Sequence, residues 1–290
     1  MSFEEDIFMI KVLGIGDNVC DKYVHSGIMY PGGQALNFSV YSKMLGASSS
    51  YMGVFGSDKV AAHIIKILDE LQVEHNRCRQ YEGENGYARV NLVNGDRVFL
   101  NSNKGGVLNK YPIQLDGEDI KYIKEFSLVH TSNNSYFNSQ LPKLKELEIT
   151  VSYDFSNRWN QPELIEEVAP FVTYAFLSCG SIEEDEVKKI CENIFSYGCK
   201  LVIATRGSLG AAVYDGEKFY FQNSKLVEAV DTLGAGDSFA SAFLLSITED
   251  IIENSYSSLS IKKAMEKGAE FASKICMKRG AFGYGIPFSE

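Results

Sequence analysis

Residues 231–244, DTLGAGDSFASAFL, place three small residues, Gly234, Ala235 and Gly236, directly before an acid, Asp237. The first N–H groups of a helix have no partner within it, so with the helix dipole they form an anion site that glycines leave open. An ionised Asp237 would repel a phosphate bound there. Asp237 therefore fits the role of a general base, which takes a proton from a hydroxyl that attacks the phosphate. The alternative is an Asp that only caps a helix after a glycine turn, which is common.

Two segments near the N-terminus offer hydrogen-bonding groups for a polyol. In YPGGQALNFSV (30–40), Gly32 and Gly33 precede an expected helix, and Asn37 lies in its first turn. The backbone of a Gly-Gly step can approach hydroxyl groups closely, and the Asn amide supplies both a donor and an acceptor. In GDNVCD (16–21), Asp17 and Asp21 follow the first expected strand. Side chains at that end of a strand face the ligand crevice of an open α/β sheet.

A dinucleotide-binding glycine motif is the competing interpretation of residues 14–19, GIGDNV. The third glycine of that motif is replaced by Val19, and Asp17 would repel a pyrophosphate, so a nicotinamide-binding site is disfavoured. A further glycine-punctuated turn, TRGSLGA (205–211), lies between two expected strands.

Composition and charge exclude several classes of protein. The chain has 290 residues and a formal net charge of −10, which disfavours a basic face for nucleic acid. No apolar run has the length of a membrane span, and the acidic N-terminus lacks the basic start of a signal peptide. None of the six cysteines forms a C-x-x-C pair or a zinc-like cluster with histidine. We therefore expect reduced thiols and a cytoplasmic protein.

Apolar runs typical of buried strands alternate with amphipathic helical runs, which predicts a mostly parallel sheet covered by helices on both faces. Residues 21–33 and 86–106 interrupt this rhythm, and the second stretch contains the hairpin signal Asn94-Gly95. They predict a small sheet that closes over the site, although an ordinary edge hairpin would give the same pattern. The expected strands are 9–16, 49–56, 127–132, 149–156, 172–178 and 200–207, and the expected helices are 35–46, 59–71, 137–147, 162–169 and 183–197.

The segments DTLGAGDSF and GGQALN resemble the two signatures of the ribokinase-like (PfkB) carbohydrate kinases, in the family's order and separation. The resemblance covers residues 9–287. It implies a three-layer α/β/α fold with a small β-sheet lid, formed by one kinase domain over residues 1–290 with lid segments near 21–33 and 86–106. It also implies phosphorylation of a sugar hydroxyl with ATP and a divalent metal such as Mg²⁺.

The resemblance also implies roles for individual residues. Asp237 would be the catalytic base, and the N–H groups of Gly234, Ala235 and Gly236 the anion hole for the transferring phosphoryl group. The implied substrate positions are Asp21, Gly33 and Asn37, with Asp17, Asn18 and Gly32 beside them. The implied nucleotide turn has Thr205, Gly207, Ser208 and Gly210. Many members bind a monovalent cation near the first Asp of the signature, here Asp231, which makes K⁺ a candidate cofactor.

Two segments depart from the family pattern. DFSNRW (154–159) is similar to the D-x-N-x-R of some members, with Ser156 where Asn is usual. Arg158 in this segment could bind a phosphate or carboxylate, or form only a surface ion pair. The family often carries N-x-x-E after a mid-sheet strand, tied to metal and phosphate, but residues 178–181 here read SCGS. Glu183 and Glu184 are candidate substitutes or simply acids favoured at a helix N-terminus, so the divalent-metal ligands stay open.

Residues 16–23, 95–107 and 153–159 are similar to those of the fructoselysine 6-kinases within the family. This implies phosphorylation of fructoselysine or a related fructosamine at the 6-position. Asp17, Asp21 and Asp154 are candidates for the cationic nitrogen of such a substrate, and Arg97 and Arg158 for its carboxylate. The alternatives are a fructokinase or ribokinase-type sugar kinase, a nucleoside kinase, and a non-catalytic sugar or nucleotide sensor. The lid could also serve as a homodimer interface.

Overall fold

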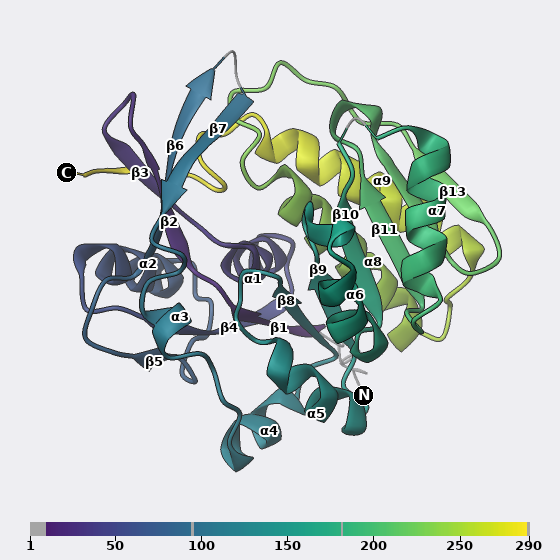
Figure 1. Cartoon of the computed structure of the whole chain (residues 1–290), viewed down its shortest axis with the longest axis horizontal. Helices are drawn as coiled ribbons and strands as arrows, with labels where there is room; N and C mark the ends of the chain where they lie inside the picture. Colours follow the sequence, from purple (N-terminus) through teal and green to yellow (C-terminus); the bar gives the residue numbers. More distant parts are fainter. Residues whose placement is uncertain (1–9, 94–95, 181, 289–290) are drawn as a thin grey trace, which may run out of the picture.

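The computed structural model describes residues 10–93, 96–180 and 182–288. Its centre is a nine-stranded main sheet (Figure 1). Strands β1, β4, β5, β8, β9, β10 and β11 pair in parallel, and β12 and β13 add an antiparallel edge. In spatial order the strands are β13 (Phe219–Gln222), β12 (Ala211–Tyr214), β11 (Leu201–Thr205), β10 (Tyr174–Ser178), β9 (Val151–Asp154), β8 (Leu128–Ser132), β1 (Lys11–Gly16), β4 (Ser48–Phe55) and β5 (Arg79–Gln80).

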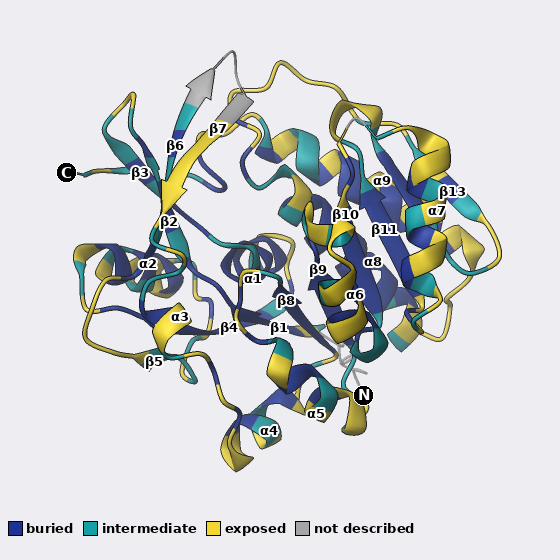
Figure 2. Cartoon of the chain, in the orientation of Figure 1, coloured by how far each residue is buried: buried dark blue, intermediate teal, exposed yellow. Residues whose placement is uncertain are grey.

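Helices cover both faces of the main sheet, because successive side chains of its strands point to opposite sides. Val12 packs in one apolar cluster with residues of α1, α8 and α9, whereas Leu13 packs in another with residues of α5, α6 and α7. This is the expected three-layer α/β/α arrangement, with buried strands between helices that are exposed on their outer sides (Figure 2). The helices are α1 (Gln34–Met44), α2 (Lys59–Glu70), α3 (Val107–Lys110), α4 (Gly117–Ile123), α5 (Leu141–Glu146), α6 (Pro162–Val168), α7 (Glu184–Phe195), α8 (Ala235–Ile252) and α9 (Ser258–Ile275), with 3-10 turns η1 (Asn138–Gln140), η2 (Arg158–Asn160), η3 (Ala169–Phe171) and η4 (Gly207–Leu209).

A second, five-stranded sheet, here called the small sheet, lies beside the main one (Figure 1). The two interruptions of the α/β rhythm supply four of its strands, as the sequence predicts, and the hairpin tip at residues 94–95 lies outside the described residues. The fifth strand comes from the far end of the chain and was not expected, because its two residues carry no strand pattern. The strands are, in spatial order, β14 (Ile286–Pro287), β3 (Ile28–Gly32), β2 (Val19–Tyr23), β6 (Gly86–Val93) and β7 (Asp96–Ser102).

The expected strands and helices of the body are present with shifted ends. The strand expected over residues 149–156 is shorter, because β9 stops at Asp154 and the chain then turns. The helix expected over residues 137–147 is divided into η1 and α5. Within the described part of the chain, no helix is both long and apolar enough to cross a bilayer.

Candidate active site

Asp237 lies in the first turn of α8, as the signature predicts. Gly234 caps this helix with φ 78°, a left-handed conformation that glycine adopts without strain. A Cβ on Gly236 would meet nothing within 4 Å, so open space lies in front of its backbone. The N–H of Ala235 donates to the Thr232 carbonyl at 3.2 Å, whereas the Gly236 N–H has no acceptor among the described residues. Gly236 is therefore the most accessible donor of the predicted anion hole.

Asn37 on α1 meets Asp237 directly, although the two residues are 200 positions apart in the sequence. The Asn37 Nδ2 donates to Asp237 Oδ2 at 2.5 Å, and Asn37 is 2% exposed. Its Oδ1 is buried and has no hydrogen-bond partner in the part of the chain that the structure describes, so an acceptor next to Asp237 is left open for a donor. Because a buried orphan acceptor is costly, a ligand hydroxyl at this point would be stabilised.

Asp17 holds the start of α1 in place. Its carboxylate accepts the N–H groups of Gln34 at 2.8 Å and Ala35 at 3.1 Å, and the hydroxyls of Ser132 and Ser135 at 3.0 Å each. The two backbone bonds satisfy orphan N–H groups at the helix N-terminus, and the two hydroxyl bonds hold the carboxylate in place beside the bend at Gly33. The structure thus gives Asp17 a positioning role, and its predicted contact with substrate stays a prediction.

Asn18 ties the start of the small sheet to β4 of the main sheet, and Asp21 lies within the small sheet. Asn18 Nδ2 donates to the Tyr51 hydroxyl at 2.8 Å and to the Val54 carbonyl at 3.1 Å. Its Oδ1 accepts Asn85 Nδ2 at 2.8 Å, so the side chain is fully engaged at the base of β6. The buried carboxylate of Asp21 on β2 faces Gly32 on β3, where a Cβ would lie 2.6 Å from Asp21 Oδ2. Gly32 thereby makes room for this carboxylate.

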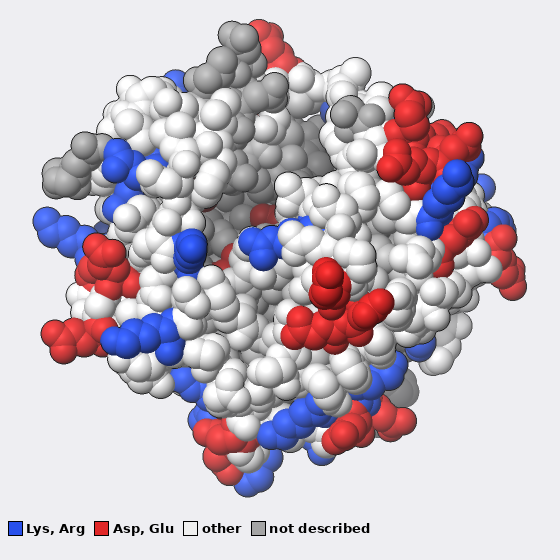
Figure 3. All heavy atoms as spheres, in the orientation of Figure 1, with Lys and Arg blue, Asp and Glu red and all other residues white. Residues whose placement is uncertain are grey.

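Asp154 adds a further acid at the end of β9. It is 7% exposed, and its Oδ1 accepts the Ser156 N–H at 2.6 Å. Burial, and then the negative charges of Asp237 and Asp17, raise the pKa of Asp154 to about 7. Figure 3 shows a hollow on this face, with acidic atoms on its floor and basic side chains beside its opening.

The two predicted arginines have different surroundings. Arg158 on η2 is exposed, and its guanidinium forms no ion pair within the described residues, so it is available to a ligand anion. Between it and Asp154, Ser156 adopts φ 53°, a conformation that Asn tolerates better than Ser. Arg97 lies on β7 of the small sheet, but its side chain is not among the described ones.

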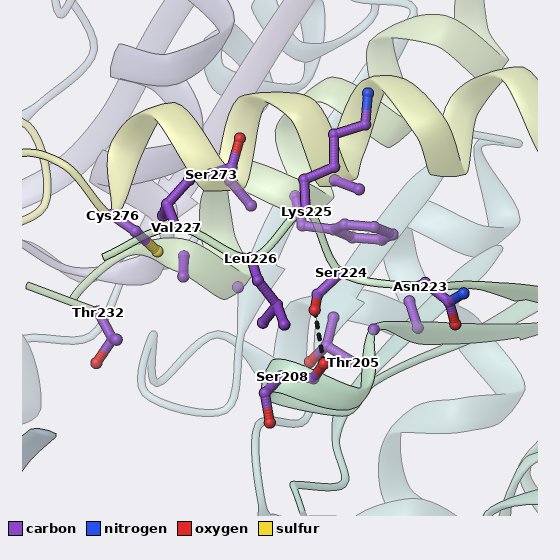
Figure 4. A pocket seen from close by; sticks show the side chains of 18 of the residues that line it. Thr205, Ser208, Asn223, Ser224, Lys225, Leu226, Val227, Thr232, Ser273 and Cys276 are labelled. Atoms are coloured by element: carbon purple, nitrogen blue, oxygen red, sulfur yellow. Dashed lines mark hydrogen bonds between the residues drawn. The ribbon is translucent and has the colours of Figure 1, made fainter. Parts of the chain in front are cut away.

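A cavity of about 490 Å³ lies on the other side of the anion hole. Its walls include the four turn residues predicted to line a nucleotide, and Ala235 and Gly236 join it to the start of α8. Leu226 lies between the end of α9, with Ser273 and the following Cys276, and the turn that carries Thr205 and Ser208 (Figure 4). The Ser224 hydroxyl donates to the Ser208 carbonyl at 2.6 Å and closes this wall.

Most of the cavity wall was not predicted, namely residues 222–227 and 229 and the inner face of α9. The segment NSKLVEAV has no helical or strand period, and only its four apolar residues before the signature could have indicated a wall. An apolar cavity beside an anion hole fits a base attached to a phosphate chain.

Comparison with known proteins identifies the family of the chain. Residues 6–284 match the model of the pfkB family carbohydrate kinases. The chain belongs to this family. It is 40% identical over 282 residues to the fructosamine kinase FrlD of Bacillus subtilis, with 96% of this chain and 95% of that protein covered. It is 28% identical over 269 residues to a fructoselysine 6-kinase of Shigella flexneri, with 92% and 98% covered.

Solved structures support the ribokinase-like fold. The ribokinase of Giardia lamblia superposes with a TM-score of 0.79 at 15% identity, covering 95% of both chains. A fructokinase from Xylella fastidiosa, solved with bound ATP, superposes with a TM-score of 0.73 at 15% identity, covering 94% of both chains.

Asp231, the predicted potassium ligand of this pfkB kinase, is fully buried and already hydrogen-bonded. Its Oδ2 accepts the Tyr23 hydroxyl at 2.7 Å and the Gly280 N–H at 2.9 Å, and its Oδ1 accepts the Leu233 N–H at 3.0 Å. These three donors use most of the acceptor positions of the carboxylate and leave one on Oδ1. The potassium site stays an untested prediction.

The hydroxyl of Tyr23 makes a testable contribution to this arrangement. We expect Tyr23→Phe to destabilise the protein by about 1–3 kcal/mol, because a buried carboxylate loses one of its donors. Urea unfolding would measure the loss, with Tyr81→Phe as the matched control, since Tyr81 is exposed. Equal stability of the two variants would contradict a structural role for the hydroxyl.

The N-x-x-E motif of the family, which the sequence lacks, has no evident replacement among the described residues. At the matching position, none of Ser178, Cys179 and Gly180 has a carboxylate or amide oxygen in its side chain. Residue 181 lies outside the described residues. Glu184 pairs with Lys188 at 2.8 Å. No group of three His, Cys, Asp or Glu side chains in the described part of this kinase could hold a metal. Mg²⁺ commonly binds through substrate phosphates with few protein ligands, so the residues are compatible with magnesium carried on ATP.

Proposed function

We propose that this pfkB kinase transfers the γ-phosphoryl group of ATP to the 6-hydroxyl of a fructosamine such as fructoselysine. The observation that carries the proposal is the contact between Asn37 and Asp237 at the mouth of α8, between an acidic hollow and an apolar cavity. The hollow suits a hydroxylated cation and the cavity suits a nucleotide base. The 40% identity to a fructosamine kinase supports this class of substrate.

The chain's own groups account for the steps of such a transfer. The Asn37 amide holds the Asp237 carboxylate, which accepts the proton of the 6-hydroxyl as that oxygen attacks the γ-phosphorus. The bond from phosphorus to the ADP oxygen breaks. The Gly236 N–H and its neighbours at the start of α8 stabilise the charge on the phosphoryl oxygens. Magnesium on the ATP phosphates would neutralise further charge.

The remaining predicted groups have supporting roles in the proposal. The small sheet acts as a lid that excludes water, and Asp21 on β2 contacts the sugar from it. Arg158 binds the carboxylate of the amino-acid part. The exposed apolar run Val98, Phe99 and Leu100 on β7 is the proposed contact of a homodimer. Six free cysteines and the use of ATP support a cytoplasmic location.

An assay of ADP formation tests the proposal. With Mg-ATP, in the presence and absence of K⁺, the purified protein would be given fructoselysine, a fructosamine without a carboxylate, fructose, ribose and adenosine. We expect kcat/KM for fructoselysine to exceed that for fructose by about 10-fold or more, the scale of one extra charged contact. Turnover of ribose or adenosine alone would agree with a kinase activity but contradict the proposed fructosamine substrate. ATP binding without turnover of any of them would favour a sensor.

A further inference from the structure

Three acids, Asp17, Asp154 and Asp237, come from the loop after β1, the end of β9 and the start of α8. Asp154 is in register with Ser132 of β8, whose hydroxyl donates to Asp17, so these two acids lie at the same end of the main sheet. The negative charges of Asp237 and Asp17 both act on Asp154. No Lys or Arg in the described ranges forms an ion pair with Asp154. A buried acid without a cation beside it is costly when ionised.

Asp154 differs from its two acidic neighbours in what its carboxyl group does. Asp17 accepts four hydrogen bonds from protein donors, and Asp237 is the proposed base. Asp154 Oδ1 accepts the Ser156 N–H, and the Gln34 amide lies near enough to the carboxyl group to oppose the rise of its pKa. The charges that act on Asp154 most strongly are the carboxylates of Asp237 and Asp17, and no basic side chain of the described residues forms an ion pair with it. Burial together with those carboxylates raises the pKa of Asp154 to about 7.

We propose that Asp154 is the counter-ion of the substrate's ketosamine ammonium, and that binding of a fructosamine expels a proton from Asp154. The inference rests on the proposed function. In the binding step the Asp154 O–H bond breaks and its proton passes to the buffer. The resulting carboxylate pairs with the secondary ammonium of the substrate, whose own N–H bonds stay intact. No electrons are transferred.

This exchange would select for fructosamines over neutral sugars. A fructosamine brings the cation that Asp154 lacks among the described residues, so the ionised form of Asp154 becomes favourable when the fructosamine is bound. Fructose brings no charge and leaves Asp154 either protonated or ionised without a partner. Because the empty site holds the proton below neutrality, fructosamine affinity should rise with pH through about 7 and then level off.

Calorimetric titration measures the proton directly in the wild-type protein. A fructosamine without a carboxylate, 1-butylamino-1-deoxyfructose, would be titrated at pH 7 in two buffers of different ionisation enthalpy, with a non-hydrolysable ATP analogue present. We expect about half a proton to be released per fructosamine bound, the fraction held by a group with a pKa near the working pH, and none with fructose. Buffer-independent binding enthalpy for the fructosamine would overturn the proposal.

Asp154→Asn tests the selectivity. We expect the ratio of kcat/KM for fructosamine to that for fructose to fall about 10²-fold, the scale of losing one partner of a buried charge pair, and proton release to disappear. Asp69→Asn, which changes an exposed acid on α2, is the matched control and should leave the ratio unchanged. An equal fall for both sugars would overturn the proposal by placing Asp154 in phosphoryl transfer. A wild-type enzyme that phosphorylates neither sugar would instead refute the proposed function.

Discussion

Replacing Asp237 with Asn should lower kcat by about 10² to 10⁴ with only a modest change in KM. The variant keeps the shape of the side chain at the start of α8 but cannot accept the proton of the attacking hydroxyl. The neighbouring Asn37 makes this a clean substitution, because its amide can still donate to the oxygen of the new side chain. Steady-state assays with varied sugar and varied ATP would separate the effect on kcat from the effect on KM.

A control on the same helix separates catalysis from folding. Asp250 lies at the far end of α8, where it pairs with Lys263 at 2.8 Å. Asp250→Asn removes an acid from the same helix away from the site, so it should alter stability and leave kcat unchanged. If Asp237→Asn retained turnover within about tenfold of the wild type, Asp237 would not be the base.

Gly33→Ala should destabilise the protein by roughly 2 to 5 kcal/mol and raise KM for the sugar at least tenfold. Gly33 has φ 113°, and an added Cβ would lie 2.7 Å from the Asp17 carbonyl and 3.0 Å from the Asn18 Cα. Both neighbours are backbone, so relief requires the start of α1 to move. That movement would displace Asn37 from the base. Urea unfolding and sugar titration would measure the two effects.

Gly46→Ala is the matched control for this clash. Gly46 has φ 94° at the end of α1, but an added Cβ there would meet nothing within 4 Å. Gly46→Ala should therefore lower the free energy of unfolding only by the backbone strain, about 1 to 2 kcal/mol, and leave KM for the sugar unchanged. Equal losses in the two variants would mean that backbone strain, and not crowding at the sugar site, explains the effect of Gly33→Ala.

Features that depend on short stretches of sequence could be predicted. The glycine bend before Asp237 and the antiparallel pairing of β6 with β7 are encoded locally, because turn chemistry and helix capping act over a few residues. The alternation of apolar strands with helices likewise predicted the layers of the main sheet. The motif resemblance then indicated which of these local features belong to one site.

Contacts between distant segments could not be predicted. Nothing in residues 286–287 indicates that they pair with β3. The cavity wall at residues 222–227 and 229 shows no helical or strand periodicity of apolar residues. The sequence also marked Asp17 and Asp154 alike as acids for a substrate. Only the folded chain distinguishes them, because Ser132 and Ser135 donate to Asp17 from more than a hundred residues away, while Asp154 is surrounded by acids.

The hydrogen bond between Tyr23 and Asp231 connects the two parts of the molecule that are proposed to hold the sugar and the phosphates. Tyr23 belongs to β2, two residues after Asp21, and Asp231 leads into the glycine bend before Asp237. We expect a shift of one part to be transmitted to the other through this buried contact. Thermodynamic linkage makes such coupling reciprocal. Sugar and ATP should bind cooperatively, each raising the affinity for the other by the same factor, and the enzyme should waste little ATP on water when no sugar is bound.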